Sequence, residues 1–196
     1  MFASLAVYCG SSPGHDPKYP ALAYALGGLL AQRGIRLVYG GGGVGMMGAV
    51  ADGVLAAGGR VTGVIPTFLN TRELQHPRVT DMRVVETMHE RKQIMATESD
   101  GFMALPGGFG TMDELFEVLT WSQLAIHDRP VGVLNVDGFF DGVLMNLNVM
   151  VERGFLRQED RDRVLSADSP GLLLESMAAW KPPGTLKFTL ARKLTN

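Results

Sequence analysis

The chain has 196 residues, of which 46% are hydrophobic and 19% are charged, and its formal net charge is −2. This length and composition are ordinary for one globular domain, and the absence of a basic stripe argues against nucleic acids and anionic membranes as partners. The apolar runs are about 4 to 8 residues long, too short to cross a bilayer. The start has no basic segment ahead of an apolar core, so we expect no signal peptide. A single cysteine, Cys9, excludes an intramolecular disulfide and fits a cytoplasmic protein.

Short apolar runs alternate along the chain with amphipathic stretches. The runs predict strands, and the stretches between and after them predict helices. Because strands covered on both faces are almost continuously apolar, this order predicts an α/β fold, a Rossmann-like doubly wound parallel sheet with helices on both faces. Strands are expected at Leu5–Cys9, Ile35–Tyr39, Val61–Ile65, Arg83–Glu86, Phe102–Leu105 and Val131–Leu134, and helices near 19–33, 45–58, 88–99, 112–126, 138–153 and 169–179.

No shift in composition marks a domain boundary, so we expect one nucleotide-binding domain over residues 1–180. The segment 181–196 has two prolines and little periodicity, which predicts a loosely held tail. Cys9 ends a buried strand and is expected to be a small core residue rather than a nucleophile.

The first glycine-rich segment, "VYGGGGVGMMGAV", follows a predicted strand and opens a helix. It contains a literal G-x-G-x-x-G from Gly43 to Gly48, the pattern of dinucleotide sites. Such a site also needs an acid at the end of the next strand, and that strand ends in Pro66 instead. A phosphate-binding P-loop would need a Gly-Lys-Ser/Thr that is absent here. Tight packing between strand and helix, without a ligand, is the alternative interpretation.

The second glycine-rich segment, "LPGGFGTMDE", covers residues 105–114. The pattern from Thr111 to Glu114 fits a capping box, which would make Glu114 a helix cap. The carboxyl ends of parallel strands meet at one edge of a sheet, however, and two glycine-rich crossings there can offer free N–H groups and helix dipoles to a phosphate. Asp113 is expected to favour the helix N-terminus.

Two cations, Arg91 and Lys92, fall in the first turns of a predicted helix, where the helix dipole disfavours them. This placement indicates a ligand-binding role, with a solvated helix face as the alternative. The four histidines form no metal set, because "HERKQ" lacks the second histidine of H-E-x-x-H, and no catalytic Ser/His or Cys/His pattern appears. The sequence thus predicts anion-binding loops with two cations and a carboxylate, and no metal.

The segment "PGGFGTMDE" fits the P-G-G-x-G-T-x-x-E motif of the LOG ("lonely guy") proteins, which are cytokinin riboside 5′-monophosphate phosphoribohydrolases. The resemblance continues through "YCGSSPG", "LVYGGGGVGMMG", "MHERK" and "LTWSQLAIHDRPVGVLNVDGFFD" and covers about residues 4–157. This family is often labelled lysine decarboxylase-like. The sequence shows no lysine set suited to pyridoxal-phosphate chemistry, which argues against that activity here.

The resemblance implies a Rossmann-like homodimer that hydrolyses the N-glycosidic bond of N6-substituted AMP, giving the free base and ribose 5-phosphate without a metal or other cofactor. It implies that Arg91 and Glu114 are catalytic. A carboxylate near C1′ can stabilise an oxocarbenium ion and activate water, as in glycosidases. The substrate contacts implied by the resemblance are Gly42, Gly43, Glu73, Arg91, Lys92, Gly107, Gly108, Gly110, Thr111, Glu114 and Thr120, of which Glu73 lies in the segment that departs most from the family pattern.

Three other functions stay open at this point. One is a nucleosidase that acts on ordinary nucleoside 5′-monophosphates. Another is a nucleotide or cofactor carrier without turnover, which would need the glycine loops but not a carboxylate at C1′. The third is a decarboxylase. For the assembly, the methionine-bearing helices around Met88–Met95 and Leu115–Leu124 are expected at a dimer interface.

Overall fold

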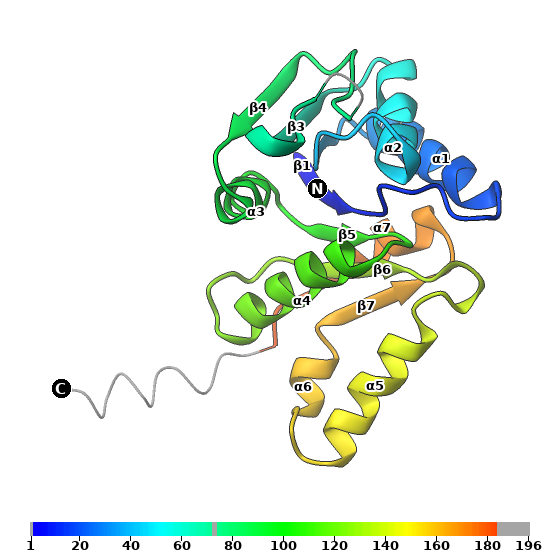
Figure 1. Cartoon of the computed structure of the whole chain (residues 1–196). Coiled ribbons are helices and arrows are strands. Elements are labelled where there is room, and N and C mark those ends of the chain that lie inside the picture. The colour runs from blue at the N-terminus through cyan, green and yellow to red at the C-terminus, as the bar shows by residue number, and fades with distance from the viewer. Residues whose placement is uncertain (1, 72–73, 184–196) are drawn as a thin grey trace.

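The protein is described here by a computed structural model that covers residues 2–71 and 74–183. The predicted α/β fold is confirmed: seven strands, all parallel, form one sheet in the order β4-β3-β2-β1-β5-β6-β7 (Figure 1). Glu73 and residues 184–196 of the predicted tail lie outside the described residues. None of the described helices is long and apolar enough to span a membrane.

Strands and helices alternate through most of the chain. The strands are β1 Ser4–Tyr8, β2 Arg36–Tyr39, β3 Val61–Pro66, β4 Asp81–Val85, β5 Phe102–Ala104, β6 Val131–Leu134 and β7 Val164–Ala167. The helices are α1 Lys18–Gln32, α2 Gly45–Ala56, α3 Met88–Thr97, α4 Phe109–Gln123, α5 Asp141–Glu152, α6 Gln158–Arg161 and α7 Pro170–Ala179, with short 3₁₀ turns at Thr67–Leu69 and Val136–Gly138.

Two apolar cores lie on opposite faces of the sheet. Alternate side chains of β1 supply both, with Leu5 and Val7 on one face and Ala6 and Tyr8 on the other. Helices α1, α2 and α7 cover the first face, and α3, α4 and α5 cover the second. Because both faces are buried, the central strands are apolar at nearly every position, which is why the sequence pattern identified them.

The order of the strands reverses beside β1. The chain adds β2, β3 and β4 on one side of β1 and then returns to place β5 on its other side. The loops after β1 and β5 therefore leave the sheet in opposite directions and open a crevice at the carboxyl edge. Ligands of doubly wound proteins bind at this switch point.

Some element predictions were wrong. The edge strand β7 was not predicted, because only Val164 of its four residues is buried and the pattern around it is polar. Strand β4 lies at the other edge and begins at Asp81, two residues before the predicted start, since only Val85 of its five residues is buried and its first residue is an exposed aspartate. Edge strands lack the continuous apolar run on which the prediction depends.

The capping box predicted at Thr111–Glu114 is also wrong. Helix α4 begins at Phe109 with Gly108 as its N-cap, so Thr111 and Glu114 already lie inside the helix. A capping box occurs instead at the start of α3. There the backbone N–H of Glu90 donates to the Thr87 hydroxyl, and the Glu90 carboxylate accepts from the backbone N–H of Thr87.

Candidate functional site

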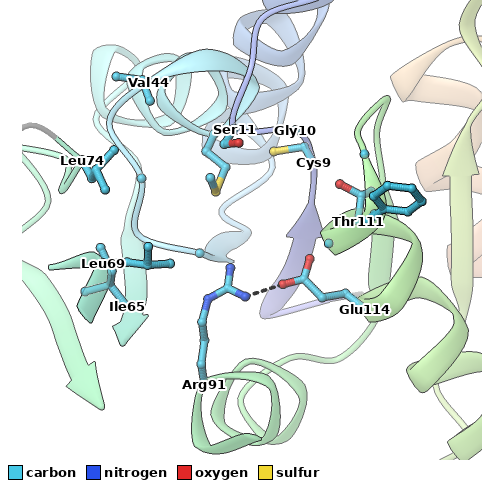
Figure 2. Close-up of a pocket in the computed structure, with 16 residues that line it drawn as sticks. Cys9, Gly10, Ser11, Val44, Ile65, Leu69, Leu74, Arg91, Thr111 and Glu114 are labelled. Atoms are coloured by element: carbon cyan, nitrogen blue, oxygen red, sulfur yellow. Dashed lines mark hydrogen bonds and ion pairs between the residues drawn. The ribbon is translucent and has the colours of Figure 1, made fainter. Parts of the chain in front are cut away.

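A cavity of about 400 Å³ opens at the carboxyl edge of the sheet, beside the switch point between β1 and β5. The ends of β1, β2 and β3, helix α3 and the start of α4 all contribute to its wall (Figure 2). The lining residues are Cys9, Gly10, Ser11, Gly40, Gly42, Val44, Met47, Ile65, Leu69, Leu74, Arg91, Gly108, Phe109, Gly110, Thr111 and Glu114.

An ion pair between Arg91 and Glu114 lies in the wall of this cavity. Nη1 of Arg91 donates to Oε1 of Glu114 over 2.6 Å, and Nε of Arg91 donates to the carbonyl of Val64 over 3.2 Å. The two side chains are 10% and 7% exposed. Figure 2 shows them pointing toward each other from α3 and α4. Two residues that are 23 positions apart in sequence are thus held as one unit, with each fixing the orientation of the other.

Burial and pairing act in opposite directions on the carboxyl group of Glu114. Desolvation, the largest effect, raises its pKa above the ordinary value, while the charge and the hydrogen bond of Arg91 lower it. The balance leaves the pKa raised. A carboxylate with a raised pKa is a better proton acceptor than one in water, which suits a general base.

The start of α4 forms the amide-rich side of the cavity. No side chain caps this helix within the described part of the chain, so its first N–H groups have no helical partner. A Cβ placed on Gly108 or Gly110 would meet no atom within 4 Å, although both residues line the cavity. Packing therefore does not require glycine at either position, whereas close approach of a ligand to the backbone would. The buried Thr111 adds a hydroxyl beside them.

The opposite side of the cavity is apolar. Val44, Leu69 and Leu74 are 45%, 38% and 39% exposed, and the buried Ile65 lies among them. Figure 2 places these four side chains across the cavity from Thr111, with Arg91 and Glu114 between the two sides. A ligand that bridges the cavity would meet hydrogen-bond donors at one end and an apolar surface at the other.

Several predicted contact residues do not line this cavity. Nζ of Lys92 is 3.1 Å from Asp113 and 3.0 Å from Glu117, so it joins α3 to α4 instead. Burial lowers the pKa of Lys92, but hydrogen bonds to Glu117 and Asp113 raise it more. Asp113, expected to favour the helix N-terminus, is the exposed member of this cluster. The hydroxyl of Thr120 donates to the carbonyl of Phe116 on the exposed side of α4.

The predicted glycine contacts divide into two groups. Gly42, Gly108 and Gly110 line the cavity. Gly43 donates its N–H to the carbonyl of Leu74 over 2.7 Å, and Gly107 packs so closely that a Cβ would lie 2.1 Å from Oγ1 of Thr111. These last two positions are accounted for by packing.

The loop after β1 supplies Gly10 and Ser11, which the sequence analysis did not assign to the site. The signal for them was the "YCGSSPG" segment, which resembled the family without pointing to a function for any one residue. Cys9 also reaches the cavity but is only 7% exposed. Burial, and the nearby Glu114 carboxylate, raise the pKa of its thiol well above the ordinary value, so it is not a thiolate nucleophile.

Fold and site together define a Rossmann-type α/β protein that holds a buried arginine–carboxylate pair in a glycine-lined cavity at the switch point. Within the described residues, no group of three or more His, Cys, Asp or Glu side chains could hold a metal ion. The chain belongs to the LOG family, whose family model, described as possible lysine decarboxylase, matches residues 47–177.

The similar proteins include several plant enzymes. A probable cytokinin riboside 5′-monophosphate phosphoribohydrolase of Oryza sativa subsp. japonica is 47% identical over 93% of this chain and 74% of its own length. A cytokinin riboside 5′-monophosphate phosphoribohydrolase of Arabidopsis thaliana is 46% identical over 92% of this chain and 84% of its own.

Solved structures with this fold include two molybdenum cofactor proteins. The molybdenum cofactor binding protein of Rippkaea orientalis is 24% identical, with a TM-score of 0.69 over 91% of this chain and 97% of its own. The molybdenum cofactor carrier protein of Chlamydomonas reinhardtii is 20% identical, with a TM-score of 0.67 over 92% of this chain and 100% of its own. At this level of identity the similarity shows the fold alone.

Proposed function

We propose that this protein is a cytokinin riboside 5′-monophosphate phosphoribohydrolase, which hydrolyses N6-substituted AMP to the free base and ribose 5-phosphate. The observation that carries the proposal is the buried Arg91–Glu114 pair, which lies between an amide-rich and an apolar side of one cavity. The names of relatives more than 40% identical over most of the chain support the same reaction.

Each part of the substrate has a matching part of the cavity. The 5′-phosphate would bind the free N–H groups at the start of α4, with Gly108, Gly110 and Thr111 around it. The base and its apolar N6 substituent would lie against Val44, Leu69 and Leu74. The ribose would then lie between the two ends, beside Glu114.

Charge development gives Glu114 its role in the reaction. As the bond between C1′ and the purine nitrogen breaks, its electron pair leaves with the base and positive charge develops on the ribose. The Glu114 carboxylate stabilises this charge and accepts a proton from the water whose oxygen adds to C1′. The guanidinium group of Arg91 offers several N–H donors and no acceptor, so Arg91 acts through hydrogen bonds. It orients Glu114 and donates a hydrogen bond to the departing purine. The purine takes up a proton from water, and Glu114 returns the proton that it accepted to the solvent, so the carboxylate is restored and the protons balance.

Base release from four compounds tests the proposal. Isopentenyl-AMP, AMP and the two corresponding nucleosides are each incubated with the protein, and free base is measured by chromatography. We expect cleavage of isopentenyl-AMP and, because the phosphate site is charge-assisted, rates on the nucleosides at least about a hundredfold lower. Equal rates on nucleoside and nucleotide would rule out the phosphate assignment.

The same assay separates the alternatives. Faster cleavage of AMP than of isopentenyl-AMP would indicate a general nucleosidase. Tight nucleotide binding with no base release would indicate a carrier. Cadaverine formed from lysine would indicate a decarboxylase. Activity that survives EDTA is expected, because the proposed chemistry uses only side chains and water.

We further propose a cytoplasmic homodimer that uses the outer face of α4. Within the predicted helices, Met95 and Leu115 are 0% and 1% exposed and belong to the core of the protomer. The exposed apolar side chains are Phe116, Leu124 and, just beyond the helix, Ile126, at 37%, 42% and 64%. This apolar strip supports an interface on α4 rather than on α3.

A further inference from the structure

The guanidinium group of Arg91 uses two of its three nitrogens on protein groups. Nε donates to the carbonyl of Val64, and Nη1 donates to Glu114. Among the described residues, none accepts a hydrogen bond from Nη2. Because Arg91 lines the cavity, the donors on Nη2 are the ones left for a bound substrate.

Gly40, the residue that follows β2, lies against this free nitrogen. A Cβ on Gly40 would be 2.1 Å from Nη2 of Arg91, 3.2 Å from its Cζ and 3.0 Å from the sulfur of Met47. The first distance is far shorter than any real contact. Gly40 is not among the residues with a positive φ, so its backbone conformation would suit other residues. Glycine is required at this position because the Arg91 guanidinium occupies the space that a side chain would take.

We propose that Gly40 is a positioning residue for catalysis: it leaves the slot in which the Arg91 guanidinium can hold Glu114 with Nη1 and offer Nη2 to the substrate. The proposal rests on the proposed function for the role of the pair. Its structural part, that Gly40 controls the contact between Arg91 and Glu114, stands on the geometry alone.

The guanidinium has little freedom to avoid an added methyl group. Arg91 as a whole is 8% exposed, its Nε is tied to β3, and Nη1 is 2.6 Å from Glu114. A methyl group on Gly40 would point at Nη2, the end of the Arg91 side chain, while the other two nitrogens of the guanidinium are bonded to Val64 and Glu114. The shift that relieves the clash therefore lengthens the bond to Glu114 or removes Nη2 from the cavity.

Loss of the contact would change how Glu114 titrates. The charged groups that affect its carboxyl are Arg91 and Lys92 from α3 and Asp113 from α4 itself. Tyr8 at the end of β1 and Cys9 just after it lie near this carboxyl with raised pKa values, so both are neutral. Arg91 is the group that lowers the Glu114 pKa most. Its displacement would raise that pKa further and move the acid limb of the kcat/KM profile to higher pH.

The test compares Gly40→Ala with Gly63→Ala, a matched substitution in the neighbouring strand β3. A Cβ on Gly63 would lie 2.6 Å from the sulfur of Met82 and 3.1 Å from Cα of Gly41, and its three nearest atoms include none of Arg91. We expect Gly40→Ala to lower kcat roughly a hundredfold, the size of effect that a misplacement of about 1 Å can have. The Glu114 pKa, measured by NMR titration of ¹³C-labelled glutamate and assigned with Glu114→Gln, should rise in Gly40→Ala and stay at the parent value in Gly63→Ala.

A double-variant cycle with Arg91→Lys completes the test, because lysine ends at about the position of Cζ and has no atom in the place of Nη2, the atom that the added Cβ would meet at 2.1 Å. Adding Gly40→Ala to Arg91→Lys should cost less than about threefold in kcat. Should Gly40→Ala fail to fold, the Gly40→Ala/Arg91→Lys protein should still fold. A parent-like Glu114 titration in Gly40→Ala, equal losses in both backgrounds, or a double variant that also fails to fold would overturn the proposal. If the parent cleaves no nucleotide, the proposed function fails, and the titration and the folding comparison still decide the structural part.

Discussion

Gly110→Ala should stabilise the protein and lower its affinity for a nucleotide. Gly110 is the second residue of α4, and a Cβ there would meet no protein atom within 4 Å. For folding alone, alanine is the better residue at a helical position. If the 5′-phosphate binds the N–H groups at this helix start, however, the methyl group would occupy the space of a phosphate oxygen.

The two expected effects have opposite signs and can be sized. Alanine in place of a helical glycine stabilises by up to about 1 kcal/mol, and roughly half of that is reasonable at the end of a helix. For a chain of this length about 1 kcal/mol shifts Tm by ~2–4 °C, so a rise of about 1–2 °C is expected. The loss of one charge-assisted hydrogen bond to phosphate, at about 1.5–3 kcal/mol, corresponds to a Kd increase of roughly 10- to 100-fold.

Two matched controls isolate the ligand effect. Gly142 and Gly171 are the second residues of α5 and α7, and a Cβ on either would also meet nothing within 4 Å. Gly142→Ala and Gly171→Ala should raise Tm by a similar amount and leave nucleotide affinity unchanged. The measurements are thermal melts and calorimetric titration with AMP. Unchanged AMP affinity in Gly110→Ala, with the same rise in Tm, would refute the assignment of the phosphate to the α4 N-terminus.

Three further predictions concern Glu114, the response to pH and the assembly. Glu114→Gln keeps an oxygen that can accept a hydrogen bond from Arg91 but loses the negative charge and the proton acceptor, so release of the free purine should fall at least about a hundredfold while AMP still binds. The control Asp113→Asn, which alters an exposed partner of Lys92, should retain most activity. An inactive Asp113→Asn variant together with an active Glu114→Gln variant would reverse the assignment. His127 donates from Nε2 to the carbonyl of Val118 and accepts at Nδ1 from the backbone N–H of Arg129, and burial lowers its pKa. Folding therefore favours the neutral imidazole of His127. Its contribution to the free energy of unfolding should be complete above pH ~6.5 and should be lost as the pH falls through the lower pKa of the folded state. In urea unfolding, acidification should reduce the stability of His127→Asn less than that of the parent. Phe116→Glu with Leu124→Glu should yield a monomer by light scattering at micromolar concentration, and Met145→Glu, an equally simple change on the exposed face of α5, should not.

The central strands, and the alternation of strands and helices along the chain, were predictable because a strand that is buried on both faces has a continuous apolar run. The edge strands show where this fails, since the pattern of β7 depends on neighbours in space rather than on its own residues. The same limit applies to the site. Lys92 stands next to Arg91 in the sequence, but one side chain lines the cavity and the other pairs with carboxylates on α4. Adjacent residues on a helix face different directions, and the sequence does not say which direction holds the ligand.

Two four-residue segments make this point more sharply. "TMHE" at residues 87–90 and "TMDE" at residues 111–114 both fit the capping-box pattern, yet only the first forms one. The second was misread because α4 begins at Phe109, immediately after Gly108, so the helix is already two residues long when Thr111 is reached. Glu114 therefore lies in the second turn of α4, where its side chain points inward to Arg91. The start of a helix, which local sequence fixes poorly, here decides between a cap and a side chain that lines the cavity.

The raised pKa of Glu114 indicates that this residue does not stabilise the folded protein at neutral pH. Its folded pKa is raised above the ordinary value, so the folded protein binds this proton more tightly than the unfolded chain does. The contribution of Glu114 to stability is therefore full below pH ~4.5 and is lost as the pH rises through the folded pKa. At neutral pH the fold carries a buried carboxylate that costs free energy, and Arg91 offsets only part of that cost. Apolar side chains in place of both Arg91 and Glu114 would avoid the cost of burying either charge. A buried carboxylate at this position is explained if it stabilises a second positive charge in addition to that of Arg91. An oxocarbenium ion formed in the adjoining cavity would carry that charge.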